Sequence, residues 1–316
     1  MRIVRDLESF SYMENCIEDS AKIKGAIAIG KFDGIHVGHQ ALLECIINMK
    51  QKGMQAVVFT FSPSPEEFFR GQVLPVIDTV EEKYSNFETM GVDVLVEYPL
   101  TKVSAAISPR DFMEKILLEK LHAGYVVSGT DLSFGNKGLG NSTMLSAFAH
   151  ANGFQYEMID KICIDNKEVS STAVRAAIIE GRMEDAAKML GREYRISGEI
   201  VHGRALGRTM KMPTINVIPS KQKLLPPSGV YATVTILDDR EILGVTNIGY
   251  KPTVSNEMKL GVETHLFDFD EDVYGKHVTV KILHFIRPEM QFSGIDSLAK
   301  QIEEDCKNAA AYFAVK

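Results

Sequence analysis

A ten-residue stretch near the N-terminus combines glycines with two histidines that are three residues apart. It reads Gly30-Lys31-Phe32-Asp33-Gly34-Ile35-His36-Val37-Gly38-His39. Glycine lets a phosphate approach the backbone, and the free N–H groups and dipole at the start of a following helix attract anions. Imidazole donors from His36 and His39 would reach the same phosphates. The stretch could therefore stabilise the charge that builds up when pyrophosphate leaves the α-phosphorus of ATP.

The same residues also allow plainer interpretations. Gly34 and Gly38 can simply make a turn, and the two histidines can be surface residues or a metal-binding pair. The position of the stretch favours phosphate binding, because it lies between an apolar strand and a helical pattern, where open α/β sheets bind ligands.

A second polar group, Ser170, Ser171 and Thr172, precedes Arg175 at a predicted helix start. The hydroxyls can cap the helix and donate to phosphate, and the planar guanidinium of Arg175 can grip phosphate oxygens. A capped helix with a surface arginine is the plainer alternative.

Oxygen-bearing residues recur on the predicted strands of the second half. Thr214 and Asn216 are two residues apart, so both side chains face one side and offer hard oxygen ligands to a magnesium ion shared with ATP phosphates. Glu263 shares a strand face with His265, and a carboxylate near such a metal is a suitable base for a primary hydroxyl. An exposed strand glutamate is equally compatible with the pattern. Glycines and arginines at 203–208 could wrap a nucleotide or form a plain turn.

Strands alternate with helices in the first half, which predicts a doubly wound α/β domain with a parallel sheet. We expect its strands at 26–29, 56–61, 92–96 and 125–127, and its helices at 40–49, 80–90 and 109–121, the last with Pro109 at its first position after Ser108.

From Tyr194 onwards, short strand-like runs follow one another with turns and no long helices between them. They predict a small antiparallel six-stranded β-barrel with a C-terminal helix packed on it by one face. The expected strands are 196–201, 214–218, 229–237, 242–248, 261–267 and 278–285, and the helix is 295–313. We assign an amphipathic helix pair at 171–190 to the first domain, so the predicted domains are 1–190 and 191–316.

Composition narrows the class of protein. A chain of 316 residues exceeds the size at which one core usually stops growing, so two domains are expected. The net charge of −7 gives no basic field for nucleic acid. Four scattered cysteines without a CxxC pair indicate reduced thiols. No stretch approaches the ~20 apolar residues of a membrane span, and no export signal is visible, so we predict a cytoplasmic protein.

The histidine stretch resembles the HxGH motif of the nucleotidyltransferase superfamily, in the GxFDGxHxGH form of prokaryotic FAD synthetases. Residues 131–140 resemble the family's adenine and ribose loop, and 169–175 resemble its SSTxIR motif. This resemblance implies catalytic roles for His36 and His39. It also implies nucleotide contacts from Gly30, Phe32, Asp33, Gly34, Gly38, Asp131, Phe134, Gly135, Ser170, Ser171, Thr172 and Arg175.

The second half resembles riboflavin kinase in five ordered stretches, 202–208, 213–216, 225–231, 247–253 and 263–269. Together the two resemblances cover nearly the whole chain and identify it as a member of the bifunctional riboflavin kinase/FMN adenylyltransferase family. The resemblance implies a loop over the phosphates, a magnesium pair and a catalytic base. The residues in these roles are Gly203, Gly207 and Arg208 for the loop, Thr214 and Asn216 for the metal, and Glu263 for the base.

The implied reactions are riboflavin plus ATP giving FMN plus ADP, then FMN plus ATP giving FAD plus pyrophosphate, with Mg²⁺ in both. Flavin contacts are expected from Ser64, Asn247 and Arg287.

This chain departs from the family at two places. Ser62 and Ser64 stand where the family usually has an acidic residue and a histidine that is thought to orient flavin or phosphate, and Lys211-Met212 replaces Gly-Phe. One alternative is therefore that only the kinase half is active. Another is a flavin- or nucleotide-binding regulator without catalysis, although such a protein would not need the base and the metal pair together.

Overall fold

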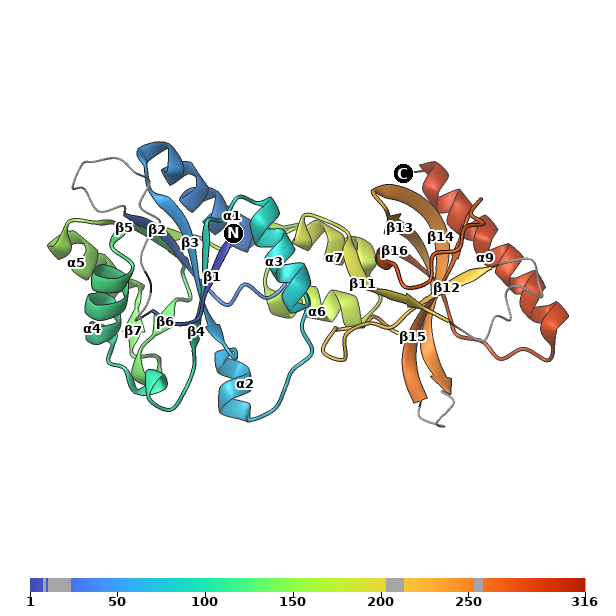
Figure 1. The fold of residues 1–316 in the computed structure, drawn as a ribbon, viewed down its shortest axis with the longest axis horizontal. Coiled ribbons are helices and arrows are strands. Elements are labelled where there is room, and N and C mark those ends of the chain that lie inside the picture. Colours follow the sequence, from blue (N-terminus) through green and yellow to red (C-terminus); the bar gives the residue numbers. More distant parts are fainter. Residues whose placement is uncertain (8–9, 11–23, 203–212, 253–257, 316) are drawn as a thin grey trace. The chain divides into compact units, whose positions relative to one another are not determined.

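The computed structural model describes residues 1–7, 10, 24–202, 213–252 and 258–315. Within these residues the chain forms two compact units (Figure 1), one made of Met1–Leu74 and Val80–Val169 and the other of Pro75–Thr79 and Ser170–Lys316. The predicted phosphate loop residues Gly203, Gly207 and Arg208, and the Lys211-Met212 pair, lie outside the described residues.

The first unit is built on a six-stranded sheet in the order β1-β4-β3-β2-β5-β8, and all its neighbouring strands are parallel. This confirms the doubly wound α/β prediction. The strands are β1 (Arg2–Val4), β2 (Gly25–Ile29), β3 (Gln55–Ser62), β4 (Val94–Pro99), β5 (Ala123–Gly129) and β8 (Gln155–Ile159).

Helices cover both faces of this sheet. Alternate residues of β2, which point to opposite faces, belong to two different cores. Ala26 and Ala28 join one core, whereas Ile27 and Ile29 join the other. The first core includes residues of α1 (Val37–Asn48) and α3 (Val80–Thr89), and the second includes residues of α5 (Ser142–Asn152) and of the helical segment after Ser108.

That segment begins as predicted and continues differently. The Ser108 hydroxyl accepts a hydrogen bond from the Asp111 N–H at the start of α4 (Pro109–Asp111). The chain then continues as the π-helix η3 (Phe112–Lys120) rather than an α-helix. Short elements complete the unit: η1 (Met49–Lys52), α2 (Pro65–Arg70), η2 (Ser104–Ala106), η4 (Asn136–Gly138), and the strand pairs β6 (Ser133–Phe134) with β7 (Gly140–Asn141) and β9 (Cys163–Ile164) with β10 (Lys167–Glu168).

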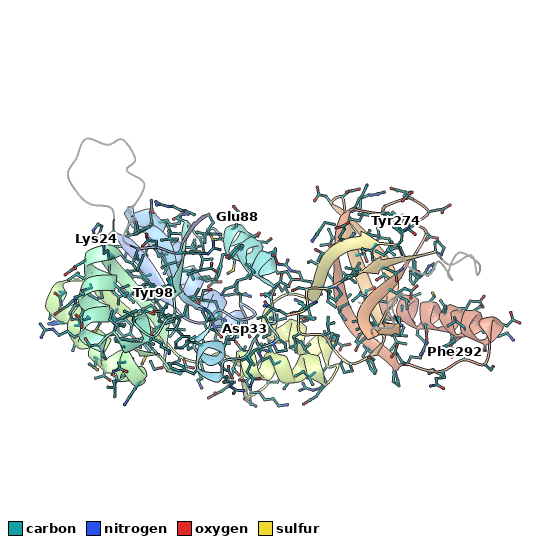
Figure 2. The ribbon with its side chains drawn as sticks, turned by 60° about the horizontal axis from the view of Figure 1, so that its bottom comes forward. Lys24, Asp33, Glu88, Tyr98, Tyr274 and Phe292 are labelled. Atoms are coloured by element: carbon teal, nitrogen blue, oxygen red, sulfur yellow. The ribbon has the colours of Figure 1, made fainter. Side chains whose placement is uncertain are left out.

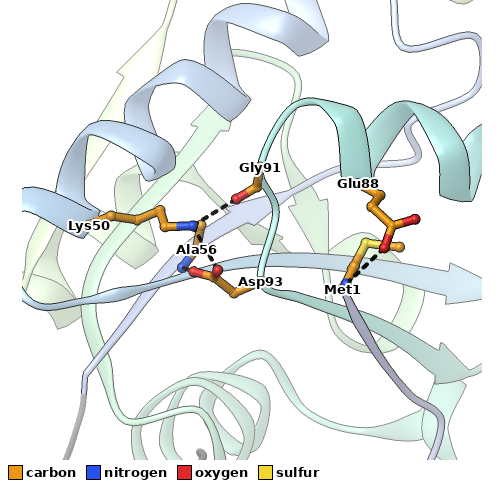
Figure 3. A network of polar contacts seen from close by, with 6 residues as sticks. All are labelled: Met1, Lys50, Ala56, Glu88, Gly91 and Asp93. Carbon is orange, nitrogen blue, oxygen red and sulfur yellow. Dashed lines mark hydrogen bonds and ion pairs between the residues drawn. The ribbon is translucent and has the colours of Figure 1, made fainter. Parts of the chain in front are cut away.

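A polar network fixes the turn between α3 and β4 (Figure 3). Lys50 Nζ donates to the Gly91 carbonyl at 3.0 Å and to Asp93 Oδ1 at 2.7 Å, while the other Asp93 oxygen accepts the Ala56 N–H at 2.9 Å. Asp93 thereby holds together the starts of β3 and β4. This leaves the opposite, carboxyl end of the sheet for the loops that carry the predicted site.

The second unit is a closed barrel in the order β11-β12-β15-β14-β13-β16, with antiparallel pairing throughout. The prediction of a six-stranded barrel followed by a helix is confirmed. Its elements are β11 (Tyr194–Val201), β12 (Thr214–Val217), β13 (Gly229–Leu237), β14 (Arg240–Pro252), β15 (Met258–Leu266), β16 (His277–Pro288) and α9 (Ile295–Val315). The helix buries Ala309 against Val230, Ala232 and Val245 on the outside of the barrel.

Two further pieces of chain pack with the barrel. Helices α6 (Ser171–Ile179) and α7 (Met183–Leu190) share its main core. The segment Pro75–Thr79 pairs with residues 222–224, since the Val76 N–H donates to Gln222 O at 2.7 Å and the Leu224 N–H donates to Val76 O at 2.8 Å. By packing, α6 and α7 thus group with the barrel, while the functional boundary at residue 190 stays a prediction. No helix within the described ranges is long and apolar enough to cross a membrane.

Two candidate active sites

The histidine stretch forms the loop between β2 and α1, at the carboxyl edge of the parallel sheet. Strand β2 lies between β3 and β5. The chain therefore continues from β2 to β3 on one side of it, and β5 is added later on its other side. Such a switch point opens a crevice that typically receives the ligand in α/β folds. Asp33 of this loop is labelled in Figure 2. The structure therefore places the predicted phosphate loop where the fold favours a ligand.

The backbone of this loop is bent into the left-handed region three times, at Phe32 (φ 51°), Gly34 (φ 83°) and Ile35 (φ 38°). Only the glycine adopts such angles without strain, and strained residues of this kind cluster at functional sites. Two hydrogen bonds to neighbouring elements hold the loop. The Gly30 N–H donates to Phe59 O of β3 at 3.2 Å, and Gln40 Nε2 of α1 donates to Ile35 O at 2.9 Å.

The two histidines lie together at the start of α1. Their rings stack with centroids 3.8 Å apart and planes 19° apart. His36 caps the helix, because its Nδ1 accepts the His39 backbone N–H at 3.4 Å. An accepting Nδ1 leaves the proton of the neutral ring on Nε2, so His36 has a donor of the kind that a phosphate needs.

Gly38 has a steric reason to be glycine. A Cβ atom at this position would lie 3.1 Å from the His36 ring, closer than packed carbon atoms normally approach. The glycine of the HxGH motif therefore lets the two histidine rings stack.

His39 is held in its neutral form. Its pKa is lowered well below the usual value, first by burial and then by the nearby His36 and Lys83. Phe32 lies beside the His39 ring, with ring centroids 5.0 Å apart. The Nδ1 atom of His39 has no hydrogen-bond partner within the described part of the chain. His39 can therefore exchange hydrogen bonds with a ligand without being a permanent cation.

The other predicted nucleotide residues of this unit divide into loop and core positions. Asp131 and Gly135 follow β5 at the same edge of the sheet as the histidine loop. Phe32 and Phe134 instead belong to the cores, at 0% and 3% exposure, so in this structure they support the loops from below. Direct contact between these two rings and a nucleotide stays a prediction.

Ser64 caps a helix, a role that was not predicted from the sequence. Its Oγ accepts the Glu67 N–H at 3.3 Å, and Glu67 Oε2 accepts the Ser64 N–H at 3.1 Å, which makes a capping box at the start of α2. The Ser-x-x-Glu spacing was the available signal for this cap. A flavin contact by Ser64 stays a prediction.

The serine and arginine motif belongs to the second compact unit. Ser170 caps α6 as expected, with its Oγ accepting the Ala173 N–H at 3.2 Å. Thr172 is exposed, and Ser171 and Arg175 are half-buried. The capping part of the prediction is confirmed, and phosphate binding by these residues stays a prediction.

The predicted kinase residues form a compact cluster on the outside of the barrel. Asn216, Glu263 and Asn247 lie opposite one another on β12, β15 and β14. The Thr214 hydroxyl donates to Glu263 Oε1 at 2.7 Å. Their strand neighbours are buried in the barrel, whereas these four side chains are half-buried on its outer surface. The prediction that Thr214 and Asn216 share one face, and that Glu263 and His265 share one face, is thus confirmed, while their roles stay predictions.

This cluster suits a hard divalent ion. It offers hydroxyl, amide and carboxylate oxygens, which are the ligands that Mg²⁺ prefers, and Mg²⁺ usually takes only one or two carboxylates and keeps several waters. Thr214 and Glu263 are close enough for their oxygens to contact one ion. The described ranges contain no group of three or more His, Cys, Asp or Glu residues placed to bind a metal.

A cavity of about 740 Å³ adjoins the cluster. Thr214 and His265 line it from the strands, and Phe269 and Tyr274, the latter labelled in Figure 2, line it from the segment after β15. His202 stacks on Tyr274 with ring centroids 3.7 Å apart. The volume is in the range of small-molecule sites, which are typically 300–1,000 Å³.

Arg287, a predicted flavin contact, is engaged by the protein itself. It lies on the same outer row, because Val230 pairs with Asn247 on one side and with Arg287 on the other. Its guanidinium donates to both carboxylate oxygens of Asp305, and its Nη1 donates to Pro288 O at 2.9 Å. No local sequence signal indicated this partner, which lies on the next helix.

Family models match both halves of the chain. Residues 18–173 match a model described as FAD synthetase, and residues 190–313 match one described as riboflavin kinase. The two matched ranges contain the two clusters described above.

Full-length relatives carry both halves in the same order. A Listeria monocytogenes protein named bifunctional riboflavin kinase/FMN adenylyltransferase is 35% identical, over 92% of this chain and 93% of its own. A Haemophilus influenzae protein with the same name is 37% identical, over 91% and 94%. A crystal structure of a macrolide-efflux protein from Streptococcus pneumoniae aligns with a TM-score of 0.84 over 98% of both chains at 24% identity, which shows the fold alone.

Proposed function

Because the chain belongs to the bifunctional riboflavin kinase/FMN adenylyltransferase family, we propose that it phosphorylates riboflavin to FMN and then adenylylates FMN to FAD, using ATP in both steps. The observation that carries the kinase assignment is the Thr214–Glu263 hydrogen bond of 2.7 Å, which places a predicted base beside a predicted metal ligand.

In the kinase half, Glu263 accepts the proton of the terminal ribityl hydroxyl as that oxygen attacks the γ-phosphorus of ATP, and ADP leaves as the bond from the γ-phosphorus to the bridging oxygen breaks. Thr214 and Asn216 would hold a magnesium ion, which would neutralise charge on the ATP phosphates. Gly203, Gly207 and Arg208 contact these phosphates. Phosphoryl transfer depends mainly on positioning and charge neutralisation, so these side chains matter as much as the base.

In the adenylyltransferase half, the FMN phosphate attacks the α-phosphorus of a second ATP and pyrophosphate leaves. His36 donates from Nε2 to the transferring phosphate, and neutral His39 supports it from the stacked position. The resemblance to the family also supports nucleotide contacts from Ser170, Ser171, Thr172 and Arg175. No covalent intermediate on the enzyme is needed, because the FMN phosphate is itself the nucleophile.

We further propose that flavin contacts come from Ser64, Asn247 and Arg287, with Arg287 oriented by its own ion pair. The partners of the protein are then its small substrates and not nucleic acid. We place it in the cytoplasm, which is supported by the four scattered cysteines without a CxxC pair and by the need for ATP in both proposed reactions.

The test is chromatography of flavins after incubation of the protein with riboflavin, ATP and Mg²⁺. Wild type should give FAD, His36→Ala should stop at FMN, and Glu263→Ala should leave riboflavin unchanged but still convert supplied FMN to FAD. A wild-type reaction that stops at FMN would leave only the kinase half active. Unchanged riboflavin and unchanged FMN would favour a binding protein and overturn the proposal.

A further inference from the structure

His265 lies in the kinase cluster without a role in the reaction as proposed above. It is opposite Thr214 in the register of β12 and β15, and it shares the outer face with Glu263, two residues earlier on the strand. Its ring Nδ1 is 2.9 Å from the carbonyl oxygen of Pro213. A carbonyl oxygen can only accept a hydrogen bond, so Nδ1 carries a proton and donates.

This hydrogen bond constrains the backbone next to Thr214, which is a predicted ligand of the metal. The Pro213 carbonyl and the Thr214 N–H form one planar peptide unit, so anchoring the carbonyl fixes the plane from which Thr214 begins. Proline has no N–H of its own, so the carbonyl is the one backbone group through which Pro213 can be held. His265 thereby bears on the direction in which the Thr214 hydroxyl points.

We propose that His265 is a positioning residue of the kinase site, whose Nδ1–H holds the Pro213 carbonyl and so keeps the Thr214 hydroxyl beside Glu263. The inference rests on the proposed riboflavin kinase activity and deepens it. His265 does not accept the substrate proton, which goes to Glu263. Because the ring also lines the cavity, the competing role is direct contact between its Nε2 and a substrate.

Two substitutions separate these roles. The side-chain amide of His265→Asn offers a donor near the position of Nδ1, whereas that of His265→Gln reaches the position of Nε2. We expect His265→Ala to lower kcat/KM for Mg·ATP in FMN formation about tenfold, the effect of one hydrogen bond of ordinary strength. His265→Asn should recover most of this loss, His265→Gln should not, and His277→Asn at an exposed position of β16 should match wild type.

Several results would overturn the inference. Recovery by His265→Gln but not by His265→Asn would assign the residue to substrate contact, and an unchanged His265→Ala would give it no role. Equal losses in all three variants, together with equally lowered melting temperatures, would mean a purely structural residue. If His265→Ala does not fold, the comparison of Asn with Gln decides alone.

A measurement without turnover keeps this test separate from that of the proposed function. In histidine-selective ¹⁵N NMR, the resonance lost in His265→Asn should be that of a ring protonated at Nδ1. A proton on Nε2 instead, with Nδ1 bare, would contradict the hydrogen bond. Absence of FMN formation by wild type would end the kinase proposal and leave this NMR result standing by itself.

Discussion

Arg287 on β16 and Asp305 on α9 form a bidentate ion pair, with Nε–Oδ1 at 2.8 Å and Nη2–Oδ2 at 2.7 Å. Asp305 is 2% exposed, and Gln301 Nε2 also donates to it at 3.1 Å. The pair joins the C-terminal helix to the outer row of strands that carries Glu263 and Asn247. The helix therefore orients a predicted flavin contact as well as covering apolar surface.

We expect Asp305→Ala to lower the free energy of unfolding of the barrel unit by about 3 kcal/mol, because the Arg287 guanidinium, whose side chain is only 16% exposed, loses its carboxylate partner. The same change should raise KM for riboflavin more than KM for ATP, since Arg287 loses its orientation. Urea unfolding followed by circular dichroism, with steady-state kinetics of FMN formation, measures both.

Glu241→Ala is the matched control for this pair. It removes the Lys281–Glu241 ion pair, in which the glutamate side chain is 62% exposed, and exposed pairs contribute at most about 1 kcal/mol. Equal effects of Glu241→Ala and Asp305→Ala would mean that burial of the Arg287–Asp305 pair has no energetic consequence.

The neutral state of His39 predicts a pH dependence of stability. Burial, His36 and Lys83 lower its pKa in the folded state below the value of 6.5 for an unperturbed ring. Between the two pKa values the unfolded chain binds more protons than the folded one, so the free energy of unfolding rises with pH in that range. The stabilisation is complete above about pH 6.5 and is lost as the pH falls below it.

We therefore expect the melting temperature of the first unit to fall from pH 7 to pH 5 in wild type, and to fall less steeply in His39→Gln. Scanning calorimetry at a series of pH values measures this difference. His150→Gln removes an exposed histidine of α5 and should keep the wild-type slope. A wild-type slope in His39→Gln would show that another group carries the pH dependence.

Gly38→Ala tests whether the stacked histidines are needed for adenylylation. Its added Cβ must push against the His36 ring, and misplacement of a reacting group by about 1 Å can reduce a rate about a hundredfold. We expect FAD formation from supplied FMN to fall by one to two orders of magnitude, with FMN formation from riboflavin unchanged as the control within the same protein. A loss of both activities would instead indicate general unfolding.

Much of the fold follows from periodicity. Strand β13 (Gly229–Leu237) has the predicted limits because apolar and β-branched residues run its whole length and glycine marks its start. Strands β1 and β8 were not predicted. Strand β1 has only three residues, and β8 is an edge strand with mostly exposed side chains, so neither carries the apolar signal on which the prediction depends. The π-helix at 112–120 has no distinct pattern, since its apolar residues fit an α-helix equally well.

The position of a site residue could be predicted where it depends on alternation along one strand or on a local motif. It could not be predicted where it depends on a hydrogen bond to a residue far away in the sequence. Thr214 and Asn216 share a face because they are two residues apart, and the motif around His36 and His39 places both at one helix start. The bond from His265 to the Pro213 carbonyl spans 52 residues. The alternation of side chains along a strand gives the face on which His265 lies. It does not give the hydrogen-bond partner of His265, because that partner depends on the register between strands of the barrel.

Substitutions at Ser64 connect the cap of α2 with the departure from the family at this position. Ser64→Ala and Ser64→His both remove the hydroxyl that accepts the Glu67 N–H, so each should cost about 1 kcal/mol of stability in the first unit. Only the histidine adds an imidazole donor for flavin or phosphate. We therefore expect Ser64→His to convert FMN to FAD faster than Ser64→Ala, measured by chromatography at matched folded fractions. Equal rates in the two variants would mean that this position acts through its helix cap alone, and that the missing histidine has no bearing on adenylylation.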